Sequence, residues 1–386
     1  MKRSYITFAH DAGKDTDSAI IVKRLVRMWF FLLSFALTLT VLTYAANNER
    51  TTISIENDRV KAVFDLGGGA LFDFHFKSQG LNPLAWRLPE PGDLKPQMMG
   101  HFICFDRLGG SSKSERSQGM PNHGEASKVM WHESESGTDS SPDGTIVKMW
   151  CELPLARMRV DRTAVLSERG SVMTVEESFT NIYHLGKLCN IVQHPSIGGD
   201  FLDDTVIVDS NAWKGYANGN PKPMYEEPTI YWPYLEKEGR KTDLRMLVDG
   251  DPNGVENFIC KNGVEKGWMT ACNPGKGLLI GYVWDTADYP WIRHWRHLEN
   301  GKPLARGLEF GTTPLPFPFG DILKKGSIFD IPIILFLDSQ ESIKKSYTLF
   351  LLDIPSDFHG VESVELFTEK ILVVERATNR TYIIPY

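Results

Sequence analysis

From residue 47 onward, apolar and polar side chains alternate with a period of two in many short stretches of the chain. In the stretch 72–76, for example, three phenylalanines alternate with Asp73 and His75 after a run of glycines at 67–69. This alternation, interrupted by Gly, Pro and Asn turns, is typical of β-strands that bury one face. It predicts further strands over 60–64, 158–160, 172–174, 268–272, 278–284 and 328–337. We therefore expect an all-β protein, either a sandwich or a barrel.

Long amphipathic helical stretches are nearly absent from the sequence. Residues 339–350 are the best candidate for a helix, although their pattern also fits a strand. The Gly- and Ser-rich stretches 109–119 and 134–144 are expected to be long loops, because patterned strand continues on both sides of each. No repeat of fixed period is present. We expect residues 47–386 to form a single large β domain.

The first 46 residues have the features of an export signal. Basic residues at 23–27 precede an apolar stretch at 28–46, which ends in small residues before the chain turns polar at Asn47. This order is typical of a signal peptide, and the apolar stretch is also nearly long enough to span a bilayer. We expect residues 1–46 to be a signal peptide or an N-terminal membrane anchor. The remaining chain is then exported, into the periplasm or outside the cell.

Charge and cysteine content narrow the class of ligand. The net charge of −7 on 386 residues is mild, and the absence of a basic stripe argues against a nucleic-acid partner. The five cysteines form no C-x-x-C pair, so they indicate buried thiols as readily as disulfides. His294 and His297 have a spacing that metal ligands use, but no H-E-x-x-H motif or cysteine accompanies them. We expect no metal and no cofactor.

Glu309 is the most informative candidate for a functional residue. On a strand, Leu308 and Phe310 face one side, while Glu309 faces the other side between Gly307 and Gly311. Glycines inside a strand often mark the close approach of a ligand. We expect open space over this carboxylate, suited to a sugar hydroxyl or another small polar group. The alternative is an edge-strand glutamate in a Gly-rich turn.

Two other polar segments, 121–126 and 190–199, each contain a histidine. His194 ends a row of alternate residues on one face of its predicted strand and is followed by proline, serine and two glycines. His123 follows Arg107 by a short segment of chain. Taken singly, His194 is also explained as a hydrogen-bonded histidine at a strand end, which is more common than a catalytic one. His123 is also explained as a turn residue, and Arg107 as a solvated loop charge.

The segment 289–297 places Trp291, Arg293 and Trp295 on one strand face just upstream of Glu309. Aromatic rings that carry a polar group suit the apolar faces of sugars as well as they suit a core. The pattern predicts a platform for a sugar, and core packing is the alternative for each tryptophan.

In this order, the segments resemble the galactose mutarotase-like (aldose 1-epimerase) superfamily. The similar features are a hairpin near 53–76, an arginine followed by a His-Gly pair at 123–124, a mid-chain strand with His194, and a Gly-x-Glu segment at 307–309. The resemblance covers most of the chain after residue 46. It implies a large antiparallel β-supersandwich with a concave carbohydrate site.

The resemblance also implies an acid–base pair that interconverts the anomers of a sugar. Glu309 matches the general base of the family and His194 the general acid, while His123 and Arg107 match residues that hold the sugar and its ring oxygen. Opening a cyclic hemiacetal needs one proton removed from the anomeric hydroxyl and another given to the ring oxygen. A carboxylate with a pKa of about 4.3 and an imidazole of about 6.5 can exchange these roles.

The sequence departs from the family pattern directly after the proposed acid. Galactose mutarotases follow the catalytic histidine with an aromatic residue and an asparagine, whereas His194 is followed by Pro195 and Ser196. This difference indicates a divergent branch, with another saccharide or with binding alone. The alternatives are a non-catalytic carbohydrate-binding protein of the same fold and an accessory protein of a polysaccharide lyase or hydrolase. The latter needs an open groove, and a tyrosine or second carboxylate near the histidine.

Overall fold

The computed structural model describes residues 50–88, 95–141, 144–217, 229–237 and 239–386. Residues Arg50–Tyr386 form one compact unit. The features expected for residues 1–46 lie outside the described ranges. No helix within those ranges is long and apolar enough to cross a membrane.

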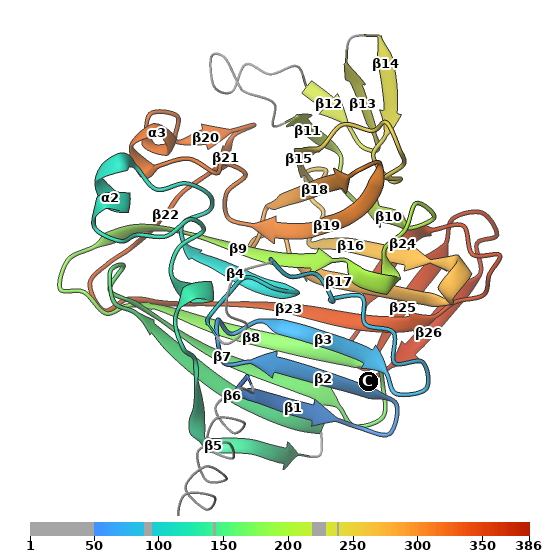
Figure 1. The fold of residues 1–386 in the computed structure, drawn as a ribbon, viewed down its shortest axis with the longest axis horizontal. Coiled ribbons are helices and arrows are strands. Elements are labelled where there is room, and N and C mark those ends of the chain that lie inside the picture. The colour runs from blue at the N-terminus through green and yellow to red at the C-terminus, as the bar shows by residue number, and fades with distance from the viewer. Residues whose placement is uncertain (1–49, 89–94, 142–143, 218–228, 238) are drawn as a thin grey trace, which may run out of the picture. The chain divides into compact units, whose positions relative to one another are not determined.

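The larger of two main sheets has 13 strands, and all of its pairings are antiparallel. In spatial order the strands are β1 (Thr52–Glu56), β2 (Val60–Asp65), β3 (Leu71–Phe76), β4 (His101–Asp106), β9 (Lys187–Ile197), β19 (Lys302–Gly311), β18 (Trp291–Glu299), β15 (Gly254–Ile259), β11 (Lys214–Ala217), β12 (Thr229–Tyr231), β13 (Tyr234–Lys237) and β14 (Arg240–Asp243), with β22 (Leu335–Leu337) beside β9. Strands far apart in sequence, such as β9 and β19, therefore lie side by side (Figure 1).

The second sheet has eight antiparallel strands. They are β10 (Ile207–Ser210), β16 (Lys266–Asn273), β17 (Leu278–Asp285), β23 (Ser342–Asp353), β8 (Val172–Asn181), β7 (Met158–Ser167), β6 (Gly144–Leu153) and β5 (His132–Ser141). Apolar side chains of both sheets, such as Phe310 and Leu349, share one buried cluster between them. The prediction of an all-β antiparallel sandwich is confirmed, because period-two alternation gives each strand one face for this common core.

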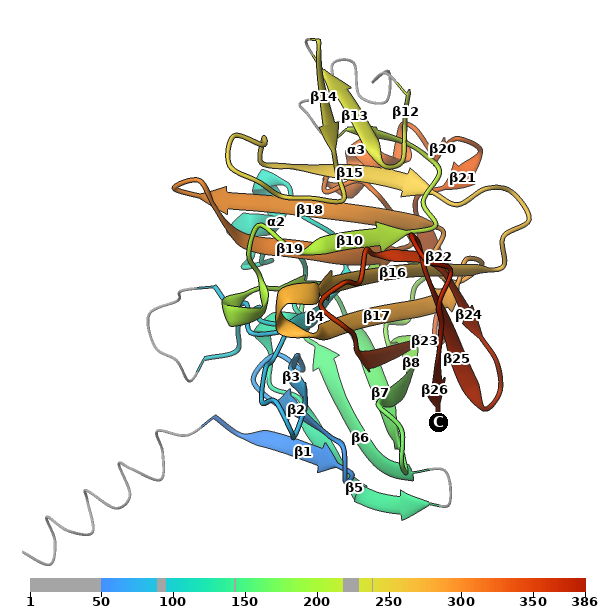
Figure 2. The same cartoon turned by 90° about the vertical axis from the view of Figure 1, so that its right-hand side faces the viewer.

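Smaller elements complete the unit. They are a C-terminal sheet of β24 (Val361–Leu366), β25 (Lys370–Glu375) and β26 (Thr381–Pro385), a hairpin of β20 (Ser327–Ile328) and β21 (Ile331–Pro332), the short helices α2 (Lys113–Ser117) and α3 (Phe319–Leu323), and the 3-10 turns η1 (Ala126–Lys128), η2 (Gly199–Phe201) and η3 (Pro274–Lys276). The C-terminal sheet packs on strands of the eight-stranded sheet, since Val373 and Leu279 belong to one buried cluster (Figure 2).

Two of the expected elements near the C-terminus are wrong. The helix candidate at 339–350 is the strand β23, which pairs with β17 and β8 in the middle of its sheet and gains hydrogen bonds on both edges. The single strand expected at 328–337 is broken into β20, β21 and β22. Phe329 and Asp330 adopt positive φ angles of 52° and 62°, so the chain turns between β20 and β21.

The two expected loops also contain regular structure. The stretch 134–144 lies in the hairpin of β5 and β6, where cross-strand pairing overrides its poor strand propensity. In the stretch 109–119, helix α2 forms because Ser112 caps its first turn and Glu115 bonds back to the backbone of Ser112.

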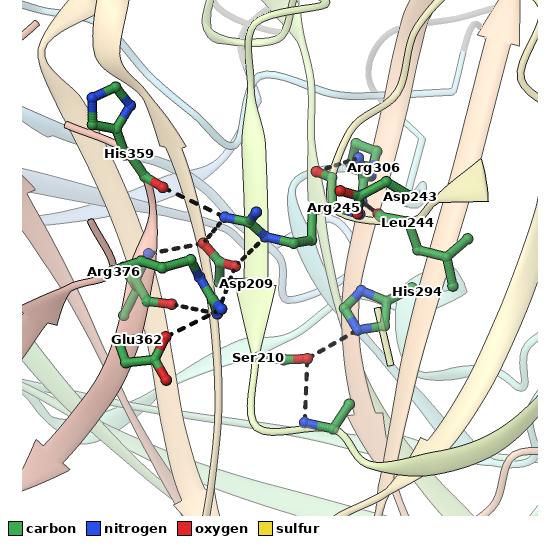
Figure 3. Close-up of polar contacts among 12 residues, drawn as sticks. Asp209, Ser210, Asp243, Leu244, Arg245, His294, Arg306, His359, Glu362 and Arg376 are labelled. Atoms are coloured by element: carbon green, nitrogen blue, oxygen red, sulfur yellow. Dashed lines mark hydrogen bonds and ion pairs between the residues drawn. The ribbon is translucent and has the colours of Figure 1, made fainter. Parts of the chain in front are cut away.

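A buried carboxylate fastens the C-terminal sheet to the rest of the unit (Figure 3). Asp209, on β10, accepts hydrogen bonds from Arg245 Nε at 2.6 Å, Arg376 Nη2 at 3.3 Å and the backbone N–H of Val361 at 2.8 Å. Arg376 also pairs with the half-exposed carboxylate of Glu362 at 3.1 Å. Because Asp209 is completely buried, its negative charge depends on these donors.

We predict that Asp209→Asn lowers the free energy of unfolding by about 3 kcal/mol, since it removes a buried charge that several donors share. Glu362→Ala removes an exposed partner of the same Arg376 and should cost less than about 1 kcal/mol. Urea unfolding of the full-length protein, followed by tryptophan fluorescence, measures both. Equal losses in the two variants would contradict the role of Asp209.

Candidate active site

Five side chains lie in one row across five neighbouring strands of the large sheet. The register pairs Asn257 with Arg293, and Arg293 with Glu309. Between β19 and β9, the paired positions before and after Glu309 place it opposite His194. His194 is in turn paired with Phe102 on β4. Directly opposed residues in antiparallel strands have Cβ atoms about 4.5–5.5 Å apart, so the register brings these side chains into contact.

Each oxygen of the Glu309 carboxylate has a partner in this row. Arg293 Nε donates to Glu309 Oε2 at 2.9 Å, and His194 Nε2 lies 3.3 Å from Glu309 Oε1. Arg293 is held in turn, because its Nη1 donates to Asn257 Oδ1 at 2.9 Å and to the Pro314 carbonyl. Glu309 is therefore fixed in orientation by a guanidinium that is itself fixed on its far side.

The charges of the pair are set by burial and by each other. Burial lowers the pKa of His194, and the nearby Glu309 carboxylate only partly offsets this effect. Burial alone would raise the pKa of Glu309, but His194 and the Arg293 guanidinium outweigh it and hold that pKa below its ordinary value. The site thus contains a carboxylate that stays ionised and an imidazole that releases its proton easily.

The second nitrogen of His194 contacts a serine. Nδ1 lies 2.9 Å from Ser196 Oγ, and the Ser196 hydroxyl also donates to the His194 carbonyl at 3.3 Å. The hydroxyl accepts from Nδ1–H when that nitrogen is protonated, and can turn to donate to Nδ1 when it is not. The ring of Phe102 stacks on the imidazole at 4.3 Å and shields one of its faces from water.

The ladder between β9 and β19 is interrupted beside this pair. Gly307 pairs with Ser196, and Phe310 pairs with Gln193. The two positions between these pairs are not paired. Pro195 lies in the gap and has no N–H to donate. The backbone N–H of Ser196 is directed to the other side of β9, where it bonds at 2.9 Å to the carbonyl of Gly100, the residue before β4.

His123 supplies a neutral donor. Its Nδ1 accepts a hydrogen bond from the backbone N–H of Gly109 at 3.2 Å, so the proton resides on Nε2. Burial lowers the pKa of His123 to about 3, with a smaller effect of His194 in the same direction. The His123 and His194 rings lie 5.9 Å apart, centroid to centroid.

These groups face a cavity of about 520 Å³, within the range of small-molecule sites. Its described lining is mostly apolar and aromatic, with few polar side chains: Trp86, Leu88, Met98, Phe102, Gly109, Gly110, Asn122, His123, His194, Val255, Arg293, Trp295, Glu309 and Pro316. Trp86 and Trp295 meet edge to face at 5.4 Å and form one wall. An aromatic wall opposite a few polar groups suits a ligand with apolar and hydroxyl-bearing faces.

Five of the seven residues chosen from the sequence line this cavity, namely Glu309, His194, His123, Arg293 and Trp295. Arg107 and Trp291 do not. The Arg107 guanidinium pairs with Asp106 and Glu115 and lines a different cavity. Trp291 shares the strand face of Arg293 but is completely buried under the segment that contains Leu315.

The space expected beside the two glycines of β19 is occupied. A Cβ on Gly311 would lie 2.6 Å from Val192 Cγ2, and one on Gly307 would lie 2.9 Å from Glu309 Oε1. The carboxylate of Glu309 therefore lies over its own neighbouring glycine. Gly307 matters because a side chain there would push the carboxylate away from His194.

Sequence reasoning missed Phe102 and Asn257, the two ends of the row. Each belongs to a strand whose neighbour is distant in sequence, and only the register reveals the contact. All five cysteines are buried and free. Among the described residues, no group of three or more His, Cys, Asp or Glu side chains could hold a metal ion.

No protein-family model and no curated protein sequence matches the chain. Solved structures do match it in fold. A galactose mutarotase-like protein from Clostridium acetobutylicum aligns with a TM-score of 0.59 at 14% identity, over 80% of this chain and 97% of that protein. One from Lactobacillus casei aligns with a TM-score of 0.54 at 18% identity, over 78% and 100%.

A galactose mutarotase related enzyme from Lactobacillus acidophilus gives a TM-score of 0.54 at 8% identity, over 79% of this chain and 98% of that protein. The alignments cover nearly the whole of each solved protein, although few residues are identical. The chain therefore has the galactose mutarotase-like fold.

Proposed function

We propose that the protein binds a free saccharide in this cavity and interconverts its anomers, with Glu309 as general base and His194 as general acid. The observation that carries the proposal is the placement of a carboxylate and an imidazole side by side, both facing an aromatic-walled cavity. The fold shared with proteins described as galactose mutarotase-like supports the same assignment.

The chemistry requires an acid and a base that reach two oxygens of one carbon atom. Glu309 removes the proton of the anomeric hydroxyl while His194 donates a proton to the ring oxygen, and the bond between the anomeric carbon and the ring oxygen breaks. The open-chain aldehyde turns about the adjacent carbon–carbon bond. Ring closure on the other face then returns the protons in the opposite direction. His123, which lines the cavity, would hold a sugar oxygen through Nε2–H during this exchange.

The spacing of the pair is shorter than the width of a sugar ring. His194 Nε2 and Glu309 Oε1 contact each other directly at 3.3 Å. The two oxygens of a hemiacetal are bonded to the same carbon, so a closely spaced acid and base still match them. A bound sugar would replace the direct contact with contacts to its own oxygens.

A second candidate function is saccharide binding without turnover. It is favoured by the pairing of Glu309 on both sides, because a carboxylate engaged by Arg293 and His194 is a weaker base than a free one. The lyase or hydrolase alternative receives less support. Among the described residues of the cavity lining, Glu309 is the only carboxylate and there is no tyrosine.

We predict that Glu309→Gln slows anomer exchange by about 10²–10⁴-fold, because the amide cannot accept the hydroxyl proton. NMR exchange spectroscopy with a panel of free aldoses measures the rate, and a ligand titration measures sugar binding, which should persist. The matched control is Glu256→Gln. Glu256 is also buried and paired with an arginine, Arg296, but lies on the opposite face of the same sheet.

If Glu309→Gln keeps the full exchange rate, Glu309 is not the general base. Saccharide binding by the wild type with no acceleration for any aldose would instead establish the binding-only function. A loss of rate in Glu256→Gln equal to that in Glu309→Gln would point to a general loss of structure.

We also predict that anomer exchange has an acidic optimum. The active form needs protonated His194, whose pKa lies below 6.5, so kcat/KM falls as the pH rises through that lowered value. It also needs ionised Glu309, whose pKa lies below 4.5, so the acidic limb appears only at lower pH. The pH dependence of kcat/KM measures both limbs. An optimum on the alkaline side of neutrality would contradict the assignment of acid and base.

A further inference from the structure

A second cavity, of about 580 Å³, lies where α2, the start of β9, β22 and the beginning of α3 come together. It lies near the first cavity but is lined by different side chains. Arg107 faces the second cavity, whereas Gly109, two residues later, lines the first. The chain thus passes from the lining of one cavity to the lining of the other within two residues, and Pro316 packs so closely on Gly109 that it leaves no room there for a Cβ.

An aromatic ring is held at the edge of this cavity without being buried. Phe336, on β22, is 58% exposed, although its strand is paired with β9. The tip of its ring lies against Gly186, where an added Cβ would be 2.3 Å from Cζ. The glycine thus fixes the ring and leaves most of its surface free for a ligand. Leu185, 57% exposed, extends the same apolar rim.

One carboxylate in the cavity, that of Asp106, has an oxygen to which no described residue donates a hydrogen bond. Asp106 is almost completely buried, and its Oδ2 accepts from Arg107 Nε and Nη2 at 2.8 Å. No described residue bonds to Oδ1. The backbone of Asp106 has a φ of 77°, which is strained for a residue other than glycine and is found more often at functional sites.

The other polar groups limit what this carboxylate can bind. Glu115 is engaged by Arg107 at 2.6 Å, and Lys187 Nζ donates to the Ala156 carbonyl and lies 5.8 Å from the Tyr183 ring. The cavity therefore combines an exposed aromatic ring, an acceptor oxygen and fixed cations. An alkyl chain would leave the second oxygen of Asp106 without a partner, whereas a ligand with one apolar face and several hydroxyls satisfies both the ring and this oxygen.

We propose that this second cavity binds a saccharide unit, which packs an apolar face on Phe336 and donates a hydroxyl hydrogen bond to Asp106. The inference rests on this cavity alone and does not depend on turnover at Glu309. It gives the protein two saccharide sites, only one of which contains the acid–base pair.

A glycan array probed with the labelled full-length protein tests the proposal. We expect a set of mono- and oligosaccharides whose binding weakens on the order of tenfold in Phe336→Ala, the scale of one lost aromatic contact. Asp106→Asn should weaken the same set, and asparagine tolerates the positive φ at that position. Trp295→Ala, in the first cavity, should leave this set bound.

Phe367→Ala is the matched control, because Phe367 is similarly exposed but lies between β24 and β25 of the C-terminal sheet. Anomer exchange should be unchanged in Phe336→Ala, so a failure of this proposal is distinct from a failure of the proposed function. The proposal is overturned if the protein binds no glycan, or if every glycan that binds is lost with Trp295→Ala and retained with Phe336→Ala.

Discussion

The register between β9, β19 and β18 is the constraint on which the site depends. Side chains alternate between the two faces of a strand, so a slip of one residue would turn Glu309 into the core and bring Leu308 to the cavity. The correct register instead aligns Arg293, Glu309 and His194 across three strands. The arrangement does not depend on one residue, because each of the three side chains makes its contact only when it lies opposite its neighbour.

A buried polar network behind the site holds β9 in that register. Gln193, beside His194 in the chain but facing the core, bonds to His101 at 3.0 Å and to Tyr289 at 3.1 Å. It also donates to Glu177 of the other main sheet, which Arg162 holds at 2.7 Å. Buried polar groups are costly unless they are paired, so this network penalises every other register. The apolar core fills the space between the sheets, but these bonds specify how the sheets align.

The fold was predictable from the sequence because period-two alternation is a local signal that each strand repeats. The facing of Glu309 away from Leu308 and Phe310 followed from the same signal. Errors arose where pairing overrides local preference: β23 resembles a helix in isolation, and the Ser- and Gly-rich stretch at 134–144 becomes a strand once β6 lies beside it.

The site was less predictable, for a related reason. Histidine and glutamate could be chosen by residue type, but Phe102 and Asn257 enter only through strand neighbours that are distant in sequence. Arg107 directly follows β4, whose Phe102 lines the first cavity, yet its guanidinium is drawn to Asp106 and Glu115. Local pattern gives the face of a residue, whereas the partner of a charged side chain depends on the whole fold.

The gap in the ladder at Pro195 has a mechanical consequence. Strands joined by continuous hydrogen bonds resist separation, but β9 and β19 lack paired positions where His194 faces Glu309. Fewer backbone hydrogen bonds hold the two strands together there than on either side, where Ser196 and Gln193 are paired, because Pro195 has no N–H to donate. In the proposed function, this weaker stretch of the ladder lies where a bound sugar would separate the touching side chains of His194 and Glu309.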